Sequence, residues 1–146
     1  MPTITPFLWF DHNAQEAMTF YCSIFPDTKV ISSSPMGVEF ELQGQRFMGL
    51  NGGPKYKFTD AVSFFVSVGT QEEIDEYWDK LLAGGGTPTM CGWLRDKYGL
   101  AWQVIPKALP KLIGDPDRAK GQRAIEAMLK MQKIDLAELQ RAHDGD

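Results

Sequence analysis

The most informative stretch of the chain runs from residue 61 to residue 82 and reads AVSFFVSVGTQEEIDEYWDKLL. Residues 61–68 are rich in β-branched and aromatic side chains, which is typical of a strand. Thr70 and Glu73 have the spacing of a capping box, in which both side chains accept backbone N–H groups at the start of a helix. Apolar residues then recur at helical spacing: Ile74, Tyr77, Trp78 and Leu81. The stretch therefore predicts a strand followed by a helix that buries one face on a sheet.

The same order of features occurs near the N-terminus, in residues 4–24, which read ITPFLWFDHNAQEAMTFYCSI. Residues 4–10 predict a strand rich in aromatic residues. Asn13 and Glu16 repeat the spacing of the capping box, with Glu16 reaching back toward the cap. The predicted buried face of this helix consists of Ala17, Phe20, Tyr21 and Ile24. The chain therefore contains an internal repeat, which is the strongest single clue to its fold.

The repeat continues beyond each helix. Short strands are predicted at residues 29–33 and 87–90, each followed by a hairpin. The first hairpin pairs residues 38–42 with 47–50 around Gly44, and the second pairs residues 91–95 with 100–105 around residues 96–99. The pattern in each half of the chain thus predicts one strand, one helix and three further strands.

The rest of the chain links these halves and adds a tail. Residues 51–60 connect the halves, and the glycines at 84–86 end the second helix. After Pro106 the pattern is helical, with caps predicted at Asp115 and Asp135. An apolar stripe is predicted at Ile125, Met128 and Leu129, and residues 143–146 are expected to fray. We predict one domain, 1–146, made of module one (about 1–54), module two (about 59–107) and a helical tail (about 108–146).

Composition narrows the class of protein. The chain of 146 residues has 15 Lys and Arg against 19 Asp and Glu, a net charge of −4, which disfavours nucleic-acid binding. It has no apolar run of about 18 residues and no secretory signal pattern at its start, so we expect a cytoplasmic protein without a membrane span. Cys22 and Cys91 are expected to be reduced thiols.

These residues together resemble the glyoxalase or vicinal oxygen chelate superfamily, which includes glyoxalase I and extradiol dioxygenases. More narrowly, the chain resembles the PhnB-like branch, often labelled 3-demethylubiquinone-9 3-methyltransferase. The matching stretches are PFLWF at 6–10, NGGP at 51–54, ExDxYWxxL at 73–81, CGWLxDxxGxxWQxxP at 91–106 and AMLKMxKID at 127–135. The resemblance implies an α+β fold in which two βαβββ modules curl a mixed sheet into a cup, with helices outside. It also implies a homodimer.

Metal enzymes of this superfamily take four ligands from the first and last strands of the two modules. The resemblance puts these positions on Thr5, Met48, Ser63 and Gln103. Two hydroxyls, a thioether and an amide lack the imidazole and carboxylate groups that a divalent first-row ion prefers. His12 and His143 fall outside the inward-facing strand positions. We therefore predict no metal and no cofactor, and we assign no catalytic residue.

Alternation along the strands predicts a ligand pocket instead. Its residues are Thr5, Phe7, Trp9, Met48, Ser63, Phe65, Trp93 and Gln103. Aromatic walls with a few polar groups suit a small aromatic or amphipathic molecule. The same aromatic side chains could equally fill a core, and Trp93 could be hairpin core. Both interpretations stay open at this point.

Three functions are consistent with these observations. The first is a metal-independent small-molecule-binding protein. The second is an enzyme, either an isomerase, lyase or dioxygenase acting near Gln103, or the methyltransferase of the family label. A methyl-donor site, however, usually has a glycine-rich turn after a strand, whereas residues 84–86 follow a helix. The third is a partner-binding protein acting through its Met-rich tail. We expect a homodimer and neither nucleic acid nor membrane as a partner.

Overall fold

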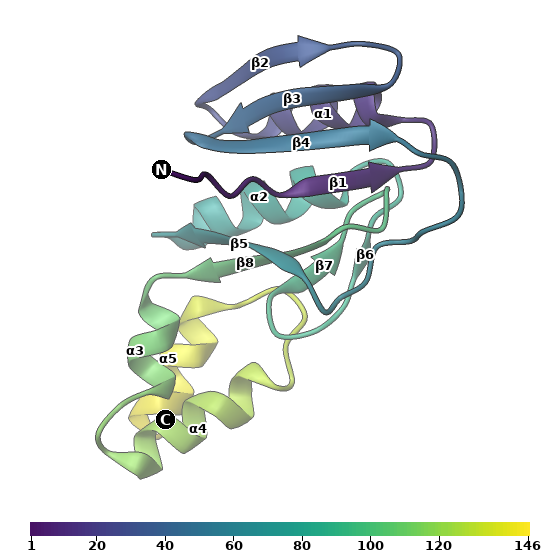
Figure 1. Cartoon of the computed structure of the whole chain (residues 1–146). Helices are drawn as coiled ribbons and strands as arrows, with labels where there is room; N and C mark the ends of the chain where they lie inside the picture. The colour runs from purple at the N-terminus through teal and green to yellow at the C-terminus, as the bar shows by residue number, and fades with distance from the viewer. The chain divides into compact units, whose positions relative to one another are not determined.

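The computed structural model describes residues 1–146 and divides into two compact units, Met1–Phe58 and Thr59–Asp146. Each unit contains one mixed four-stranded sheet (Figure 1). The predicted α+β class, with two repeated βαβββ modules and a helical tail, is confirmed. The helices are too short or too polar for any of them to cross a membrane.

The first unit contains module one. Its elements are β1 (Phe7–Phe10), α1 (Ala14–Ile24), β2 (Thr28–Ser33), β3 (Gly37–Leu42) and β4 (Gln45–Asn51). The sheet has the order β1-β4-β3-β2, with β1 parallel to β4 and the other pairs antiparallel. The first strand is shorter than the predicted 4–10, because Pro6 has no N–H to continue the ladder beyond its carbonyl, which accepts from the Met48 N–H at 2.9 Å.

The second unit contains module two and the tail. Module two has β5 (Ser63–Val68), α2 (Gln71–Leu82), β6 (Thr87–Pro88), β7 (Trp93–Arg95) and β8 (Ala101–Pro106). Its sheet order, β5-β8-β7-β6, repeats that of module one, with β5 parallel to β8. The tail forms α3 (Ala108–Ile113), α4 (Arg118–Met128) and α5 (Leu136–Asp144).

The strand register confirms the repeat residue by residue. Phe7 of β1 lies opposite Met48 of β4, and Phe65 of β5 lies opposite Gln103 of β8. Met48 and Gln103 therefore occupy equivalent positions, and so do Thr5 and Ser63, two residues before the two phenylalanines. On the far side of each last strand, Glu39 pairs with Met48 and Trp93 pairs with Gln103.

One face of each sheet is covered by its own helix. In module one, Tyr21 of α1 stacks on Phe40 at 6.3 Å between ring centroids, and Phe40 stacks on Phe47 at 5.5 Å. In module two, α2 packs on β7 and β8, and Phe64 meets Trp102 edge-on at 5.4 Å. The predicted helix faces are confirmed except at Phe20 and Tyr77, which are only half-buried.

The capping box of α2 is confirmed with one difference. The Thr70 hydroxyl accepts the Glu73 N–H at 3.2 Å. The Glu73 carboxylate accepts from the N–H of Gly69 at 3.2 Å, one residue before the cap. Local sequence therefore determines where this helix begins.

The predicted cap of α1 is wrong, because the Asn13 side chain makes no capping hydrogen bond. Asn51, at the end of β4, accepts the Ala14 N–H at 2.8 Å instead. Its amide group also donates to Gln15 Oε1 at 2.9 Å and to the Pro35 carbonyl at 3.0 Å. One side chain thus joins the start of α1, the end of β4 and the β2–β3 turn.

We expect Asn51→Ala to lower the free energy of unfolding by about 1–2 kcal/mol, because three hydrogen bonds around a helix start are lost. The matched substitution Asn13→Ala should change it by less than about 0.5 kcal/mol. Urea denaturation measures both. An Asn13→Ala cost equal to that of Asn51→Ala would show that the helix start relies on its local cap.

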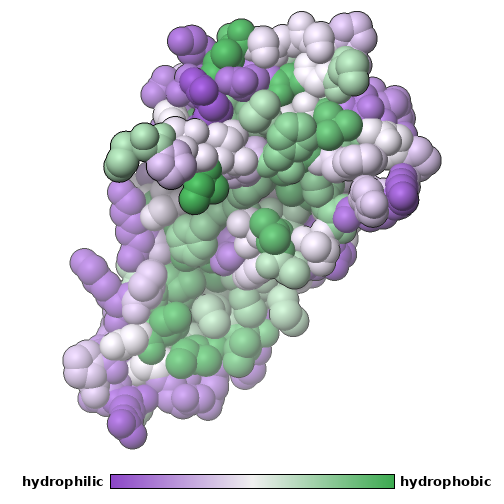
Figure 2. Space-filling view, viewed as in Figure 1, coloured by the Kyte–Doolittle hydropathy of each residue, from purple (hydrophilic) through white to green (hydrophobic).

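The tail differs from prediction at three places. Asp117 rather than Asp115 caps α4, and Asp115 accepts the Asp117 N–H at 2.8 Å, which sets up the turn before the helix. The fully buried α4 residues are Gly121 and Ala124, whereas Ile125 and Met128 of the predicted stripe are half-buried and Leu129 is 58% exposed. Hydrophobic residues accordingly appear on the surface over the tail (Figure 2). The Asp135 cap of α5 is confirmed.

The end of the chain is also more ordered than predicted. α5 continues to Asp144, and Gly145 ends it in the left-handed conformation at φ 87°. His143 is only 9% exposed and bonds to Asp115 and Asp144.

Candidate functional site

The face of each sheet opposite its helix, here called the open face, carries the predicted pocket residues. In module two the strand register aligns Phe65, Gln103 and Trp93 in one row across β5, β8 and β7. Phe65 is 56% exposed, and Gln103 and Trp93 are half-buried. An exposed phenyl ring beside a half-buried amide and indole forms a mixed apolar and polar surface of the kind that binds small molecules.

The polar groups of this row are neutral. The Gln103 amide donates to the Ser63 hydroxyl at 3.0 Å, so these two predicted residues do come together. At the next pair along the strands, Arg95 donates to both carboxylate oxygens of Asp60, at 3.0 and 2.7 Å. The hydrogen bond from Arg95 lowers the pKa of Asp60 below its usual value. The open face of module two can therefore offer hydrogen bonds from Gln103 and Ser63, while its charged pair is self-compensated.

The equivalent row of module one consists of Phe7, Met48 and Glu39. Phe7 is 55% exposed, like its counterpart Phe65. The Glu39 carboxylate lies 3.4 Å from the Arg46 guanidinium. Glu39 was not predicted, although it is the counterpart of Trp93 in the other module. The alternation of residues 37–42 around the buried Phe40 could have revealed it.

Trp9 and Thr5 lie beside this row. The Trp9 indole N–H donates to the Gly53 carbonyl at 2.9 Å, and the Tyr56 ring meets it edge-on at 4.9 Å. Gly52 lies so close that a Cβ there would be 2.4 Å from the indole, which requires glycine at this position. The linker thus holds Trp9 in place. Thr5 is half-buried and precedes β1.

The four positions that the resemblance implies as metal-ligand positions do not supply the donors that a divalent first-row ion prefers. In module two, Ser63 and Gln103 supply a hydroxyl and an amide that are bonded to each other. In module one, Thr5 and Met48 supply a hydroxyl and a thioether, and the neighbouring Glu39 carboxylate is engaged by Arg46. Such ions require imidazole, carboxylate or thiolate ligands to replace water. Within neither unit do three His, Cys, Asp or Glu side chains gather as metal ligands.

The two cysteines do not provide a reactive centre. Burial raises the pKa of both the Cys22 and the Cys91 thiols above the usual value. Because the thiolate is the nucleophile, a raised pKa leaves less of each thiol in its reactive form at neutral pH.

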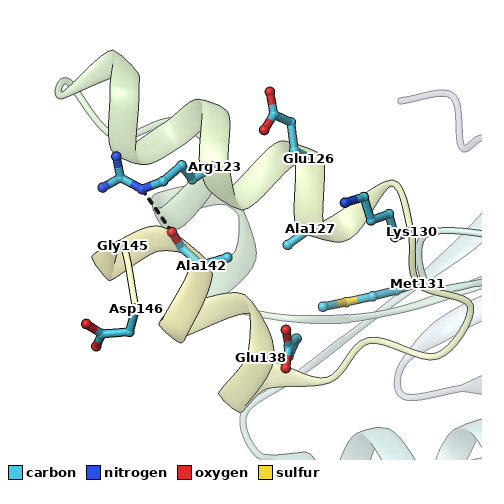
Figure 3. Close-up of a pocket in the computed structure, with 9 residues that line it drawn as sticks. All are labelled: Arg123, Glu126, Ala127, Lys130, Met131, Glu138, Ala142, Gly145 and Asp146. Carbon is cyan, nitrogen blue, oxygen red and sulfur yellow. Dashed lines mark hydrogen bonds between the residues drawn. The ribbon is translucent and has the colours of Figure 1, made fainter.

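A separate groove of about 470 Å³ lies between α4 and α5 (Figure 3). Its charged lining residues have both signs: Arg123, Lys130, Glu126, Glu138 and Asp146. Arg123 donates to the carbonyls of Ala142 and His143, at 3.0 and 2.9 Å, and so satisfies the end of α5. This groove is the contact between the two tail helices, and the Arg123 guanidinium is already hydrogen-bonded within that contact.

His143 bonds to carboxylates on both sides of its ring, at 3.0 Å to Asp144 and 2.7 Å to Asp115. These bonds, that of Asp144 first, raise the pKa of His143 above its usual value. The cationic Lys120 of α4 acts electrostatically on Asp115 and Asp144, and Arg123 of α4 donates to the His143 carbonyl. A histidine whose pKa is raised in the folded protein stabilises the fold fully at pH values below its usual pKa. This stabilisation is lost as the pH rises through the raised pKa.

We therefore expect the melting temperature to fall between about pH 6 and about pH 9, and His143→Gln to remove much of this pH dependence. His12→Gln is the control, because the His12 side chain is 81% exposed. Scanning calorimetry at the two pH values measures the effect. A fall of the same size in His143→Gln would contradict this assignment.

The part of the chain that contains the two modules is similar to known proteins. A family model described as 3-demethylubiquinone-9 3-methyltransferase matches residues 2–105. The PhnB protein of Bacillus cereus is 33% identical, with a TM-score of 0.65, over 72% of this chain and 99% of that chain. No curated protein sequence matches the chain.

Two more distant structures share the fold. A protein of Pseudomonas aeruginosa, PA1353, is 21% identical with a TM-score of 0.59, over 73% of this chain and 98% of that chain. A fosfomycin resistance protein of Listeria monocytogenes, FosX, complexed with Mn(II) and sulfate, is 16% identical with a TM-score of 0.57. It is matched over 76% of this chain and 94% of that chain.

Proposed function

The chain belongs to the 3-demethylubiquinone-9 3-methyltransferase family, and from this premise we propose that it binds a small aromatic or amphipathic molecule without a metal. Its fold is that of the glyoxalase or vicinal oxygen chelate superfamily, as the sequence predicted. The residues proposed to contact the ligand lie on the open face of each module. These are Thr5, Phe7, Trp9, Met48, Ser63, Phe65, Trp93 and Gln103.

The row formed by Phe65, Gln103 and Trp93 carries this proposal. Phe65, which lies on the edge strand β5 and is 56% exposed, leaves apolar surface in contact with water. Covering such surface contributes about 25 cal/mol per Å² of apolar area. An aromatic ligand stacked on the ring gains about 0.5–1.5 kcal/mol beyond that burial. The adjacent Gln103 and Ser63 would orient a polar substituent on the ligand.

A thermal-shift screen tests the proposal. The protein is first treated with a chelator and then screened against a library of small aromatic alcohols, acids and amines. We expect some compounds to raise the melting temperature, because a ligand at 100 times its Kd adds about 2.7 kcal/mol to the stability of the folded state. If no compound in the library raises the melting temperature, the proposal is contradicted.

The enzyme alternative rests on the Gln103 amide, which is the central polar group of the row. It predicts stoichiometric metal in the purified protein, or a turnover that Gln103→Ala abolishes. Methyl transfer has less support, because Gly84 and Gly85, at φ 85° and 125°, end α2 instead of opening a helix toward a donor. Calorimetric titration with S-adenosylmethionine should therefore show no binding.

As part of the same proposal, the protein is a cytoplasmic homodimer. The outer strands β2 and β6 are sheet edges, which proteins normally cover. Val30 on β2 is 53% exposed and Leu129 in the tail is 58% exposed, so apolar surface is available for a second copy. Light scattering that gives a 16.4 kDa particle at micromolar concentration would contradict the homodimer.

A further inference from the structure

The tail lies beyond residues 2–105, the part of the chain that the family model matches, yet it is bound closely to module two. The Cys91 N–H donates to the Met131 carbonyl at 2.8 Å, and the Gly92 N–H donates to the Gln132 carbonyl at 2.7 Å. Cys91 has φ 57°, a left-handed conformation that costs energy for a residue other than glycine. The carbonyls of the tail therefore stabilise a strained turn immediately before Trp93.

A buried contact accompanies these hydrogen bonds. Ile134 is 0% exposed, although it lies outside any helix or strand. A Cβ on Gly92 would be 3.1 Å from the Ile134 side chain and 2.6 Å from that of Ile105. Ile105 follows Gln103 by two residues on β8, so it lies on the same open face. Ile134, in residues 131–134, here called the tail segment, thus packs beside the open face one row beyond Gln103.

Polar contacts from α2 hold the tail segment in place. The Gln71 amide donates to the Ile134 carbonyl at 3.0 Å and accepts the Leu136 N–H at 2.8 Å. Lys133 lies 2.9 Å from Asp75, and this hydrogen bond lowers the pKa of the carboxyl below its usual value. Gln71 therefore joins the beginning of α2 to the beginning of α5.

Module one has a counterpart of this arrangement. Its row beyond Met48 contains Trp9 and Leu50, which pair in the parallel ladder as Ser67 and Ile105 do in module two. The linker covers that row, because Gly53 accepts from Trp9 and the Tyr56 ring contacts it. In each module another segment therefore packs beside the equivalent row: the linker in module one and the tail segment in module two.

We infer that the tail segment is the end wall of the ligand site on module two and positions Trp93 for the ligand. This inference rests on the proposed function. It gives the tail a role in specificity: Ile134 limits how far an aromatic ligand that rests on Phe65, Gln103 and Trp93 can extend along the strands. Gln71 is a positioning residue, because it acts on the site only through the tail segment.

Two variants test the inference in the full-length protein. Gln71→Ala removes the side-chain hydrogen bonds to Ile134 and Leu136. Its control is Gln140→Ala, because the Gln140 amide donates to Asp144 on the same helix. Ile134→Ala shortens the wall, and Leu139→Ala is its control, because Leu139 is equally buried and lies on α5, which packs mainly on α4. The measurements are amide exchange at Cys91 and Gly92, and the affinities for phenol and 2-naphthol from the Trp93 NMR signals.

We expect Gln71→Ala to speed exchange at Cys91 and Gly92 by about tenfold and to weaken 2-naphthol binding several-fold. Ile134→Ala should raise the ratio of the 2-naphthol affinity to the phenol affinity by about threefold or more, because the site becomes longer. A loss of stability alone would weaken both compounds alike. The two controls should leave the exchange rates and the ratio unchanged.

Other outcomes separate this inference from the proposed function. Unchanged exchange at Cys91 and Gly92 in Gln71→Ala would overturn the positioning role. If Ile134→Ala leaves the affinity ratio unchanged while both compounds still bind at Trp93, Ile134 does not form an end wall of the site. The proposed function would stand in that case. If neither compound binds the unmodified protein, the proposed function fails and the wall fails with it.

Discussion

Asp96→Ala should lower the free energy of unfolding by about 3 kcal/mol or more, a large part of the stability of a domain of this size. Asp96 is only 3% exposed. Its carboxylate accepts the N–H groups of Tyr98 and Leu100, at 2.8 and 3.1 Å, and the indole N–H of Trp102 at 2.9 Å. Removing it leaves three donors without this acceptor at the turn between β7 and β8, and at least the Leu100 and Trp102 donors are buried.

Chemical denaturation measures this effect, with Asp79→Ala as the control. Asp79 is an exposed residue of α2, and its substitution should change stability by less than about 0.5 kcal/mol. Asp96→Asn should lie between the two, because the amide keeps one acceptor oxygen. A cost below about 1 kcal/mol for Asp96→Ala would mean that the turn does not depend on this carboxylate.

Trp93→Ala should weaken the binding of 2-naphthol at least about tenfold, because the ligand loses one aromatic wall of the site. The fold should survive. The Trp93 N–H donates to the Met90 carbonyl at 2.9 Å and its carbonyl accepts the Thr89 N–H at 3.0 Å, and neither bond involves the side chain. Circular dichroism should therefore be unchanged.

Tyr77→Ala is the control for this prediction, because Tyr77 is a half-buried aromatic residue on α2, away from the open face. It should leave 2-naphthol binding intact. If Trp93→Ala instead abolishes cooperative unfolding, Trp93 belongs to the hairpin core, which is the other interpretation that its sequence context allowed.

The elements of the fold could be predicted from the sequence because their signals are local and occur twice. The helix of module two begins at Gln71 because the preceding residue, Thr70, supplies the cap. The helix of module one begins at Ala14 because of Asn51, a residue distant in sequence, so local spacing pointed to Asn13 instead. The strand register, and with it the equivalence of Met48 and Gln103, followed from the repeat.

The site was less predictable because part of it depends on contacts without periodicity. Ile134 is completely buried in a segment that is neither helix nor strand, so no apolar pattern indicates it. Ser63 and Gln103 were assigned to one site from the family resemblance, and their hydrogen bond is consistent with that assignment. Glu39 was not predicted, although it lies opposite Met48 as Trp93 lies opposite Gln103.

Metal-free recognition of an aromatic molecule by module two is the central claim, and one titration tests it most directly. Chelator-treated, ¹⁵N-labelled protein is titrated with 2-naphthol while the backbone amide signals of Phe65, Trp93 and Gln103 are followed. We predict that these signals move together and saturate, while those of α2 stay in place. No movement with 2-naphthol, or movement only after a divalent metal ion is added, would contradict the claim.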